Sequence, residues 1–277
     1  IDALVQTAST YQEHRACIQM IERVTLDKVI LIADRGYENY NIMSHAIEKG
    51  WKFLIRIKDV HSNGIASGLE LPQTAVFDMD INLILTRNQT KSKKQAGYKF
   101  MPTVQTFDYL PIGSKEDYPI SFRIARFKIA DDSYETVITN LDRFCFSAEK
   151  LKELYHLRWG IETSFRELKY AIGLTSFHAK KVDYIKQEIF ARLALYNYCE
   201  LITTYVVEHT ENISKKNQVN FTIAIYICRE YLRRKRKLRP PDVVKLIEKH
   251  ILPIRPGRRD PRKVKPQASV SFLYRVA

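Results

Sequence analysis

The fold is decided by a ten-residue stretch, K-V-I-L-I-A-D-R-G-Y, at residues 28–37. Residues 28–33 contain a short, continuous apolar run, which is typical of a strand that is buried on both faces. Asp34 follows this run directly, and Gly36 then allows a sharp turn. Because ligands gather at the C-terminal ends of strands in open α/β sheets, Asp34 is a candidate functional residue.

The segments on either side of this stretch predict an α/β sheet. Residues 1–6 have the pattern of a strand, and residues 11–24 have helical periodicity. A helix is expected at residues 39–49 and a further strand at residues 51–58. Strands and helices that alternate in this way are typical of α/β proteins.

Residues 60–140 have a different character, with few helical stretches and several alternating runs. One such run lies at residues 81–85. Two more, at residues 121–130 and 134–139, are joined by Asp131-Asp132-Ser133, which is a hairpin signal. We therefore expect a β-rich insertion here.

Helical patterns return after this insertion. Ser147 is a good N-cap for a long helix over residues 148–171. A second long helix is expected at residues 182–207, and shorter helices at residues 221–232 and 241–250.

The composition excludes several classes of protein. Hydrophobic residues make up 45% of the 277 residues, which is typical of a globular protein. No GxGxxG and no GxxxxGK[ST] motif occurs, so the sequence gives no support for a Rossmann or P-loop nucleotide site. The four cysteines form no CxxC pair, which predicts free thiols in a reducing cytoplasm. No apolar run approaches the roughly 20 residues of a membrane span.

The positive charge is concentrated near the C-terminus. The formal net charge is +14, and residues 229–277 hold 16 Lys+Arg against 4 Asp+Glu. A cluster this dense predicts a polyanionic partner, which is DNA, RNA or an anionic membrane face. The alternative is a solvated surface that keeps the protein soluble.

Four polar residues share one side of the expected helix 148–171. At 100° per residue, Tyr155, Arg158, Glu162 and Lys169 fall within a stripe about 60° wide. One interpretation is a solvent-facing stripe in which Arg158 and Glu162 form an i,i+4 ion pair. The aromatic side chains of Tyr155 and Trp159 argue against it, because they are costly to leave in water.

Two segments together resemble the bacterial DDE transposases of the insertion-sequence-four type. They are L-I-A-D-R-G-Y at residues 31–37 and Y-H-L-R-W-G-I-E-T-S-F-R-E-L-K at residues 155–169. The second segment matches the Tyr-Arg-Glu-Lys signature of that group in residue type and spacing. T-N-L-D at residues 139–142 and R-P-G-R-R-D-P-R at residues 255–262 are also similar. The resemblance covers nearly the whole chain, from about Ala3 onward.

The resemblance implies an α/β, ribonuclease-H-like fold that a β-strand insertion interrupts, with a C-terminal helical basic region. We expect the first part of the catalytic core at residues 1–59, the β-rich insertion at 60–140, the rest of the core with the Glu-bearing helix at 141–210, and a basic region for DNA contact or dimerisation at 211–277.

The resemblance also implies that Asp34 and Glu162 are catalytic metal ligands. In this fold three carboxylates converge on divalent metal, expected to be Mg²⁺ with Mn²⁺ as a substitute. Clustered carboxylates repel one another, and two metal ions about 3.5–4 Å apart remove that penalty while supporting in-line displacement at phosphorus. The implied function is hydrolysis at transposon ends followed by strand transfer into target DNA. The alternatives are a nuclease that does not join strands and a decayed or repurposed DNA-binding protein.

The implied partner is double-stranded DNA, both the terminal inverted repeats and the target, and the implied assembly is a homodimer. By the resemblance, Tyr155, Arg158 and Lys169 grip phosphates at the transposon end. The other candidate DNA contacts are basic residues, for several of which simple solvent exposure is the alternative: Arg56, Lys180, Lys181, Arg233, Arg234 and Arg236. No membrane association is expected, and the location is the bacterial cytoplasm, at the nucleoid.

The first of the three acids has no match in this chain. Asp2 lies too close to Asp34, because only one strand and one helix fit between them. We therefore interpret residues 1–6 as the third strand of the fold and expect the opening strands, with the first acid, to be missing. The chain is then predicted to be inactive alone, and Mn²⁺-dependent nicking of its own terminal repeats by this chain would contradict that prediction.

Overall fold

The computed structural model describes most of the chain and divides it into two compact units. The described residues are 3–7, 9, 11–60, 62–90, 93, 97–210, 217–235, 239–254 and 271–272. The first unit is Asp2–Trp159, and the second is Gly160–Ala277 together with Ile1. None of the helices in these described ranges is long and apolar enough to cross a membrane. All four cysteines are free thiols, as the sequence predicts.

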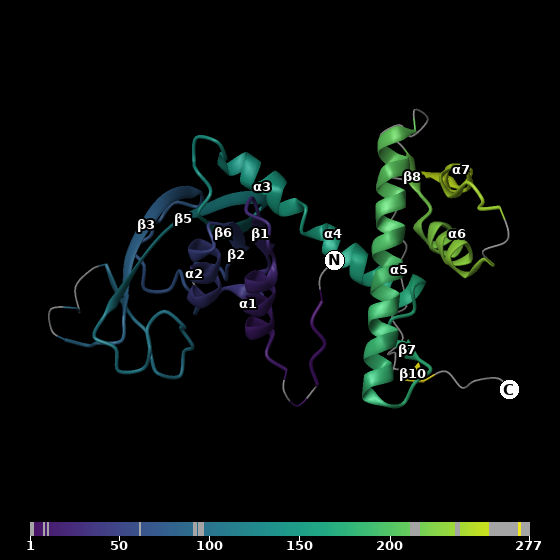
Figure 1. Cartoon of the computed structure of the whole chain (residues 1–277). Helices are drawn as coiled ribbons and strands as arrows, with labels where there is room; N and C mark the ends of the chain where they lie inside the picture. The colour runs from purple at the N-terminus through teal and green to yellow at the C-terminus, as the bar shows by residue number, and fades with distance from the viewer. Residues whose placement is uncertain are drawn as a thin grey trace. The chain divides into compact units, whose positions relative to one another are not determined.

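The first unit is built on a six-stranded mixed sheet in the order β1-β2-β6-β5-β3-β4 (Figure 1). The strands are β1 (Ile30–Ala33), β2 (Lys52–Arg56), β3 (Phe77–Thr86), β4 (Tyr98–Phe100), β5 (Asp117–Ala130) and β6 (Ser133–Thr139). β1 pairs in parallel with β2, and β3 with β4, whereas the other neighbours are antiparallel.

Helices cover both faces of this sheet. Two of them, α1 (Glu13–Arg23) and α2 (Tyr40–Glu48), pack on one face, and α3 (Ala148–His156) packs on the other (Figure 1). Successive side chains of a strand point to opposite faces, and β2 shows the result. Phe53 and Ile55 join the apolar core beneath α1 and α2, while Leu54 joins the core beneath α3 with Leu151.

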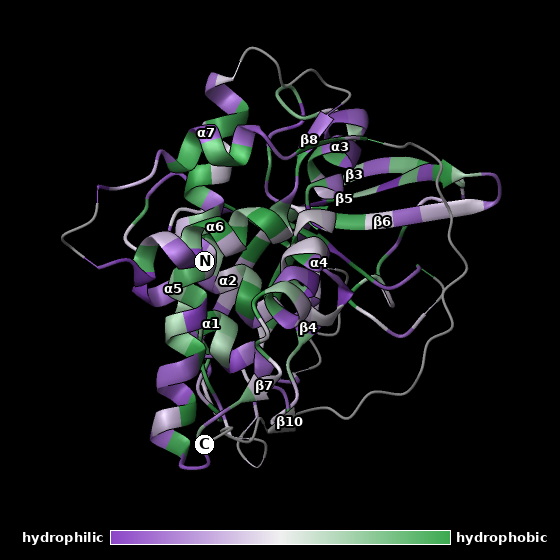
Figure 2. Ribbon diagram, turned by 90° about the vertical axis from the view of Figure 1, so that its right-hand side faces the viewer, coloured by the Kyte–Doolittle hydropathy of each residue, from purple (hydrophilic) through white to green (hydrophobic). Residues whose placement is uncertain are grey.

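The expected hairpin between β5 and β6 is confirmed. Asp132 adopts a positive φ of 54°, a conformation that aspartate tolerates in tight turns. The connection is hydrophilic, as Figure 2 shows. β6 also pairs with β2, so the β-rich segment continues the same sheet that begins with β1 and β2. The predicted domain boundaries stay predictions.

Two strand predictions are corrected. Residues 3–6 are not a strand, and residues 1 and 2 lie outside the described part of the chain. β1 is not buried on both faces, because Ile30 is 36% exposed. The reason is its place at the end of the strand order, where β2 is its only neighbour in the sheet among the described residues. An edge strand receives less cover from the packed helices.

The second unit is mainly helical. Its helices are α4 (Trp159–Arg166, whose first residue closes the first unit), a π-helix (Glu167–Ala171), α5 (Val182–His209), α6 (Phe221–Arg233) and α7 (Val243–Glu248). Two short strand pairs complete it, β8 (Asn217–Val219) with β9 (Ile251–Pro253) and β7 (Ser176–Phe177) with β10 (Ser271–Phe272).

Contacts among α5, α6 and α7 form the core of the second unit, and both shorter helices lie beside α5 (Figure 1). Cys199 and Val206 of α5 pack with Cys228 and Ile247 of the other two helices. The predicted helices 182–207 and 221–232 are confirmed. The helix predicted at 241–250 is shorter, because Asp242 caps its start by accepting a hydrogen bond from the Lys245 amide.

Candidate functional site

Asp34 lies immediately after β1, as predicted, in a tight turn with an exposed side chain. Its Oδ1 accepts a hydrogen bond from the Gly36 amide at 2.8 Å. The Tyr37 amide donates to the Asp34 carbonyl at 3.1 Å, which closes a single 3₁₀ turn over Arg35–Tyr37. Among the described residues no hydrogen bond reaches Asp34 Oδ2. One carboxylate oxygen is thus fixed by the backbone, and the side chain as a whole is exposed.

Gly36 leaves room for this close approach. A Cβ atom at position 36 would stand 3.0 Å from Asp34 Oδ1, closer than ordinary van der Waals contact. The D-R-G-Y sequence therefore places glycine where the aspartate carboxylate folds back over the turn.

The first turn of α1 holds this loop from a distant part of the sequence. His14 Nε2 donates to the Gly36 carbonyl at 2.7 Å, and the Tyr37 hydroxyl donates to Glu13 Oε1 at 2.7 Å. Hydrogen bonds from Tyr37 and Tyr11 hold the pKa of Glu13 below its ordinary value. Sequence reasoning missed these residues, because no local pattern connects them to the loop.

Glu162 and Lys169 belong to the second unit. Glu162 lies in the first turn of α4 with an exposed side chain. Lys169 is exposed within the π-helix that continues α4. π-Helical turns are rare and frequently occur at functional sites.

The single helix predicted at residues 148–171 is wrong. α3 ends at His156, and the Leu157 and Arg158 amides donate to carbonyls three residues back, at 3.1 and 3.0 Å. These shorter bonds tighten the turn, and α4 begins at Trp159. Gly160 adds a residue of low helix propensity at the break. The stripe that placed Tyr155 in line with Glu162 depended on an unbroken helix, so its geometry does not hold.

Tyr155 is a core residue of the first unit. It is 3% exposed and packs with Leu54 and Leu151 beneath α3. Its hydroxyl is among the buried polar atoms that have no hydrogen-bond partner in the described chain. Burial raises the pKa of Tyr155, and the positive charge of Arg158 acts in the opposite direction.

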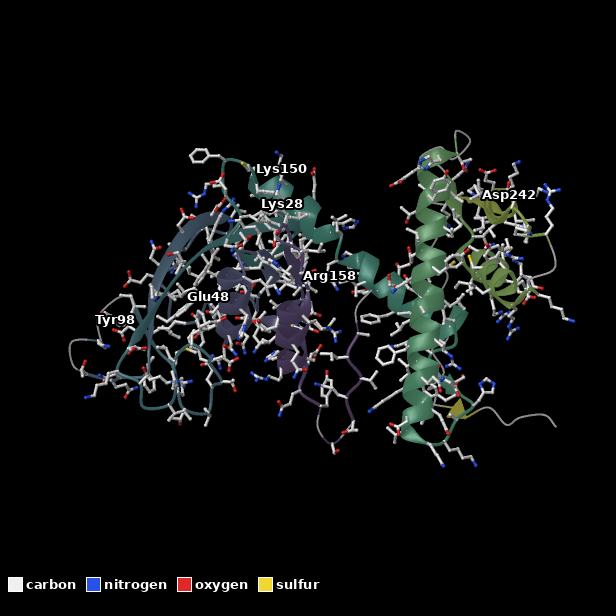
Figure 3. The ribbon with its side chains drawn as sticks, viewed as in Figure 1. Lys28, Glu48, Tyr98, Lys150, Arg158 and Asp242 are labelled. Carbon is white, nitrogen blue, oxygen red and sulfur yellow. The ribbon has the colours of Figure 1, made fainter. Side chains whose placement is uncertain are left out.

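Arg158 lies at the junction of α3 and α4 and is labelled in Figure 3. Its guanidinium lies over the Tyr155 and Trp159 rings, at 5.7 and 5.2 Å from their centroids. Such cation–π contacts hold the planar group in one orientation. Arg158 is therefore a cation held between two aromatic rings at the end of the first unit.

The remaining candidate DNA contacts have mixed surroundings. In the first unit Arg56 pairs with Glu135 at 3.2 Å. In the second unit the exposed Lys180 and Lys181 immediately precede α5. The remaining three candidate arginines lie at and after the end of α6. Arg233 pairs with Glu230 at 3.8 Å, and Arg234 lies over the Tyr231 ring at 5.0 Å from its centroid. Arg236 lies outside the described residues.

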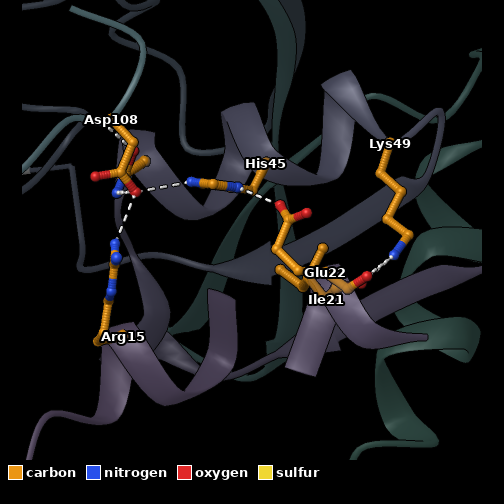
Figure 4. Close-up of polar contacts among 7 residues, drawn as sticks. Arg15, Ile21, Glu22, His45, Lys49 and Asp108 are labelled. Atoms are coloured by element: carbon orange, nitrogen blue, oxygen red, sulfur yellow. Dashed lines mark hydrogen bonds and ion pairs between the residues drawn. The ribbon is translucent and has the colours of Figure 1, made fainter. Parts of the chain in front are cut away.

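A second polar network joins α1, α2 and the loop before β5 (Figure 4). His45 contacts Glu22 through Nδ1 at 2.7 Å and Asp108 through Nε2 at 2.9 Å. Arg15 and Asn41 also donate to Asp108, at 3.1 and 3.0 Å. Burial raises the pKa of Asp108, but the hydrogen bonds from His45 and Asn41 outweigh it, so the pKa lies below its ordinary value. This network fixes α1, which also carries Glu13 and His14.

The donor set of the candidate site suits a hard divalent cation. Asp34 and Glu162 offer carboxylate oxygens, the ligands that Mg²⁺ and Mn²⁺ prefer. Within the part of the chain that the structure describes, no group of three or more His, Cys, Asp or Glu side chains is arranged to hold a metal ion. The two acids lie in different units, so each is a separate part of the candidate site.

Known proteins match much of this chain. A family model described as "Transposase DDE domain" matches residues 1–198. The chain is 23% identical over 178 residues to the probable transposase for insertion sequence element IS5377 of Geobacillus stearothermophilus, which covers 63% of the chain and 40% of that relative. It is 39% identical over 57 residues to the transposase for insertion sequence element IS421 of Escherichia coli, which covers 21% of the chain and 15% of the relative. The alignments thus span less than half of either relative.

Proposed function

The chain belongs to the transposase DDE domain family, and from that premise we propose that it is the catalytic part of a DNA transposase. It cuts phosphodiester bonds at the ends of an insertion sequence and joins those ends to target DNA. The observation that carries this proposal is the family match over residues 1–198, which includes both Asp34 and Glu162. The insertion-sequence transposases among its relatives support the same function.

Asp34 and Glu162 are proposed to hold Mg²⁺, with Mn²⁺ as a substitute, together with a third carboxylate that the resemblance implies. When bound, the ions neutralise the acids and stabilise the charge that develops on the attacking and leaving oxygens. The Gly36 amide fixes Asp34 Oδ1 and leaves Oδ2 for the cation, which supports this role. Both acids are ligands in this proposal and neither acts as a general base.

Cationic side chains close to Glu162 in the sequence are proposed to hold the DNA backbone. Arg158 offers a guanidinium fork that two aromatic rings keep in place, and Lys169 offers an exposed ammonium. A phosphate contact from Tyr155, which the resemblance implies, would require its hydroxyl to become exposed when DNA binds, because that hydroxyl is buried and has no good hydrogen-bond partner among the described residues. Such contacts position the scissile strand without reading its sequence.

The basic C-terminal segment is proposed to lie along double-stranded DNA, and two copies of the protein to hold two transposon ends. Lys180, Lys181, Arg233, Arg234 and Arg236 add phosphate contacts in this scheme. Arg236 lies outside the described residues. The other four side chains are exposed or partly exposed, which supports contact with phosphates. Arg56 can take part only by sharing its charge with Glu135.

The test separates cleavage from binding. The longest reading frame that contains this chain is incubated with DNA carrying its flanking sequences, in Mg²⁺ or Mn²⁺. Glu162→Ala is expected to abolish cleavage and to leave DNA binding intact, because metal ligation and DNA binding use different side chains. Glu153→Ala, an exposed glutamate of α3, is the matched control and cleaves normally. Loss of binding together with cleavage in Glu162→Ala would contradict the metal-ligand role.

The products of the same reaction decide between transposase and nuclease. A transposase yields 3′-OH ends that become covalently joined to target DNA. Cleaved ends that are never joined would indicate a nuclease of the same fold, and binding without any cleavage would indicate a repurposed DNA-binding protein.

A further inference from the structure

A chain of hydrogen bonds connects the Asp34 carboxylate to α1. The Gly36 amide donates to Asp34 Oδ1 at 2.8 Å, and the Gly36 carbonyl accepts from His14 Nε2 at 2.7 Å. Both polar groups of one glycine are therefore engaged, one by the acid and the other by the helix. Glycine has the greatest backbone freedom of all residues, and a side chain at this position would make the Asp34 carboxylate give way. External hydrogen bonds must therefore supply the restraint that a side chain would give.

The second ring nitrogen of His14 is also held. Asn39 Nδ2 lies 3.3 Å from His14 Nδ1, while Asn39 Oδ1 accepts from the Asn41 amide at 2.7 Å. The backbone contact assigns the oxygen of Asn39, so its NH₂ group faces His14 and donates to Nδ1. A carbonyl can only accept, so Nε2 carries the proton. His14 therefore donates through Nε2, and its ring has a polar neighbour at each nitrogen.

The neighbouring residue of α1 gives the loop a second attachment. The Tyr37 hydroxyl donates to Glu13 Oε1 at 2.7 Å. Burial, and then this hydrogen bond, raise the pKa of Tyr37, so the phenol keeps its proton at neutral pH. Consecutive residues of α1 therefore hold consecutive residues of the loop, and the network around His45 anchors α1 itself.

We propose that His14 is a positioning residue: by fixing the Gly36 peptide, it orients the Asp34 carboxylate toward a divalent cation. The inference rests on the proposed function, in which Asp34 is a metal ligand. Hydrogen bonds behind a metal ligand orient it, and their removal typically weakens metal binding by about 10–100-fold. His14 acts two hydrogen bonds away from the carboxylate, so about 10-fold is expected.

The test measures Mn²⁺ binding directly, without a cleavage assay. Paramagnetic broadening of the amide signals of residues 34–38 is followed in the ¹⁵N-labelled 277-residue chain as Mn²⁺ is added. His14→Ala is expected to raise the Mn²⁺ concentration for half-maximal broadening by about 10-fold. His14→Gln places an amide N–H near the position of Nε2 and is expected to restore binding to within about 3-fold of the unmodified chain. His209→Ala, an exposed histidine at the end of α5, is the matched control and leaves the value unchanged.

A pair of isosteric variants keeps the test decisive if His14→Ala does not fold. His14→Asn places its amide nearer to Nδ1 than to Nε2, so it cannot reach the Gly36 carbonyl. The half-saturation concentration of His14→Asn should exceed that of His14→Gln by several-fold, whereas a general effect on folding would lower the melting temperature of both alike. Equal Mn²⁺ binding by the two variants would overturn the inference.

The outcomes also separate this inference from the proposed function. If Asp34→Asn leaves the broadening at residues 34–38 unchanged, Asp34 is not the ligand and the metal-binding part of the proposed function fails. If Asp34→Asn removes the broadening but every His14 variant binds Mn²⁺ like the unmodified chain, only the positioning role is overturned.

Discussion

Replacing Tyr155 with phenylalanine is expected to stabilise the first unit. The Tyr155 side chain is 3% exposed, and its hydroxyl has no hydrogen-bond partner among the described residues. A buried hydroxyl that makes no well-formed hydrogen bond loses its hydration on folding, and the neighbouring Arg56 side chain compensates only part of that loss. Tyr155→Phe removes only that oxygen and leaves the ring packed against Leu54 and Leu151.

The expected gain is about 1 kcal/mol in the free energy of unfolding. An unsatisfied buried polar group costs about 1–3 kcal/mol, and the low end applies because the charges of Arg158 and Arg56 lie close to the phenol. For a unit of this size, 1 kcal/mol corresponds to a rise of about 3 °C in melting temperature. Tyr155→Ala, which also removes the ring, should cost about 3–5 kcal/mol.

Urea unfolding followed by tryptophan fluorescence measures this change in the right part of the molecule. Trp51 is 5% exposed in the core of the first unit, so its emission reports the unfolding of that unit, whereas Trp159 is 55% exposed and contributes little change. Tyr184→Phe, at a position that is 57% exposed, is the control and should change stability by less than about 0.5 kcal/mol. A loss of stability in Tyr155→Phe would refute the reasoning, because it would mean that the interaction of the hydroxyl with Arg56 outweighs the lost hydration. Weaker DNA binding by the stabilised variant would support the proposed phosphate contact.

Three further predictions concern other parts of the chain. Asp108→Asn should lower the free energy of unfolding by about 1 kcal/mol at pH 7. Because the folded-state pKa of Asp108 is depressed, this difference should persist down to about pH 4 and vanish as the pH falls further. Urea unfolding at several pH values measures it. Gly36→Ala should lower the free energy of unfolding by about 1 kcal/mol, because the added Cβ pushes the Asp34 carboxylate away from the turn. The amide of residue 36 should then exchange its hydrogen faster. Unchanged exchange would contradict the close approach. If the basic C-terminal segment neutralises about 6–10 phosphates, DNA affinity should fall by about 10³–10⁵ between 50 and 200 mM salt, and a flat salt dependence in a gel-shift titration would contradict backbone contact.

Local patterns predicted the elements well wherever a short segment carries its own signal. The apolar run before Asp34, the Ser147 cap and the Asp131-Asp132-Ser133 turn each encode a structure within a few residues, and all three are present. The cap and the turn are decided by local hydrogen bonds and backbone conformation, whereas the strand needs β2 as its pairing partner.

Hydrophobic periodicity gives a wrong prediction where a helix is interrupted but the spacing of its apolar residues continues. Apolar residues recur at helical spacing straight through Leu157, so periodicity predicts one helix where the backbone forms two. The same prediction placed Tyr155 beside the other polar residues, whereas the sheet packs against it.

Contacts between distant segments were beyond sequence reasoning. His14 and Glu13 hold the Asp34 loop from 20 or more residues away, and nothing in their local sequence identifies that loop as the partner. Asp108 and His45 meet in the same way, across 63 residues. The packing of the helices and strands determines which of these residues meet, so the three-dimensional structure is needed to identify such pairs.

The central claim is that Asp34 and Glu162 bind the same divalent cations to act on DNA. Anomalous scattering from Mn²⁺ in crystals of the chain bound to a transposon-end DNA tests it most directly. The account predicts an anomalous peak within about 2.0–2.6 Å of carboxylate oxygens from both residues and next to a DNA phosphate. Mn²⁺ that is bound by other side chains, with Asp34 or Glu162 left in solvent, would contradict it.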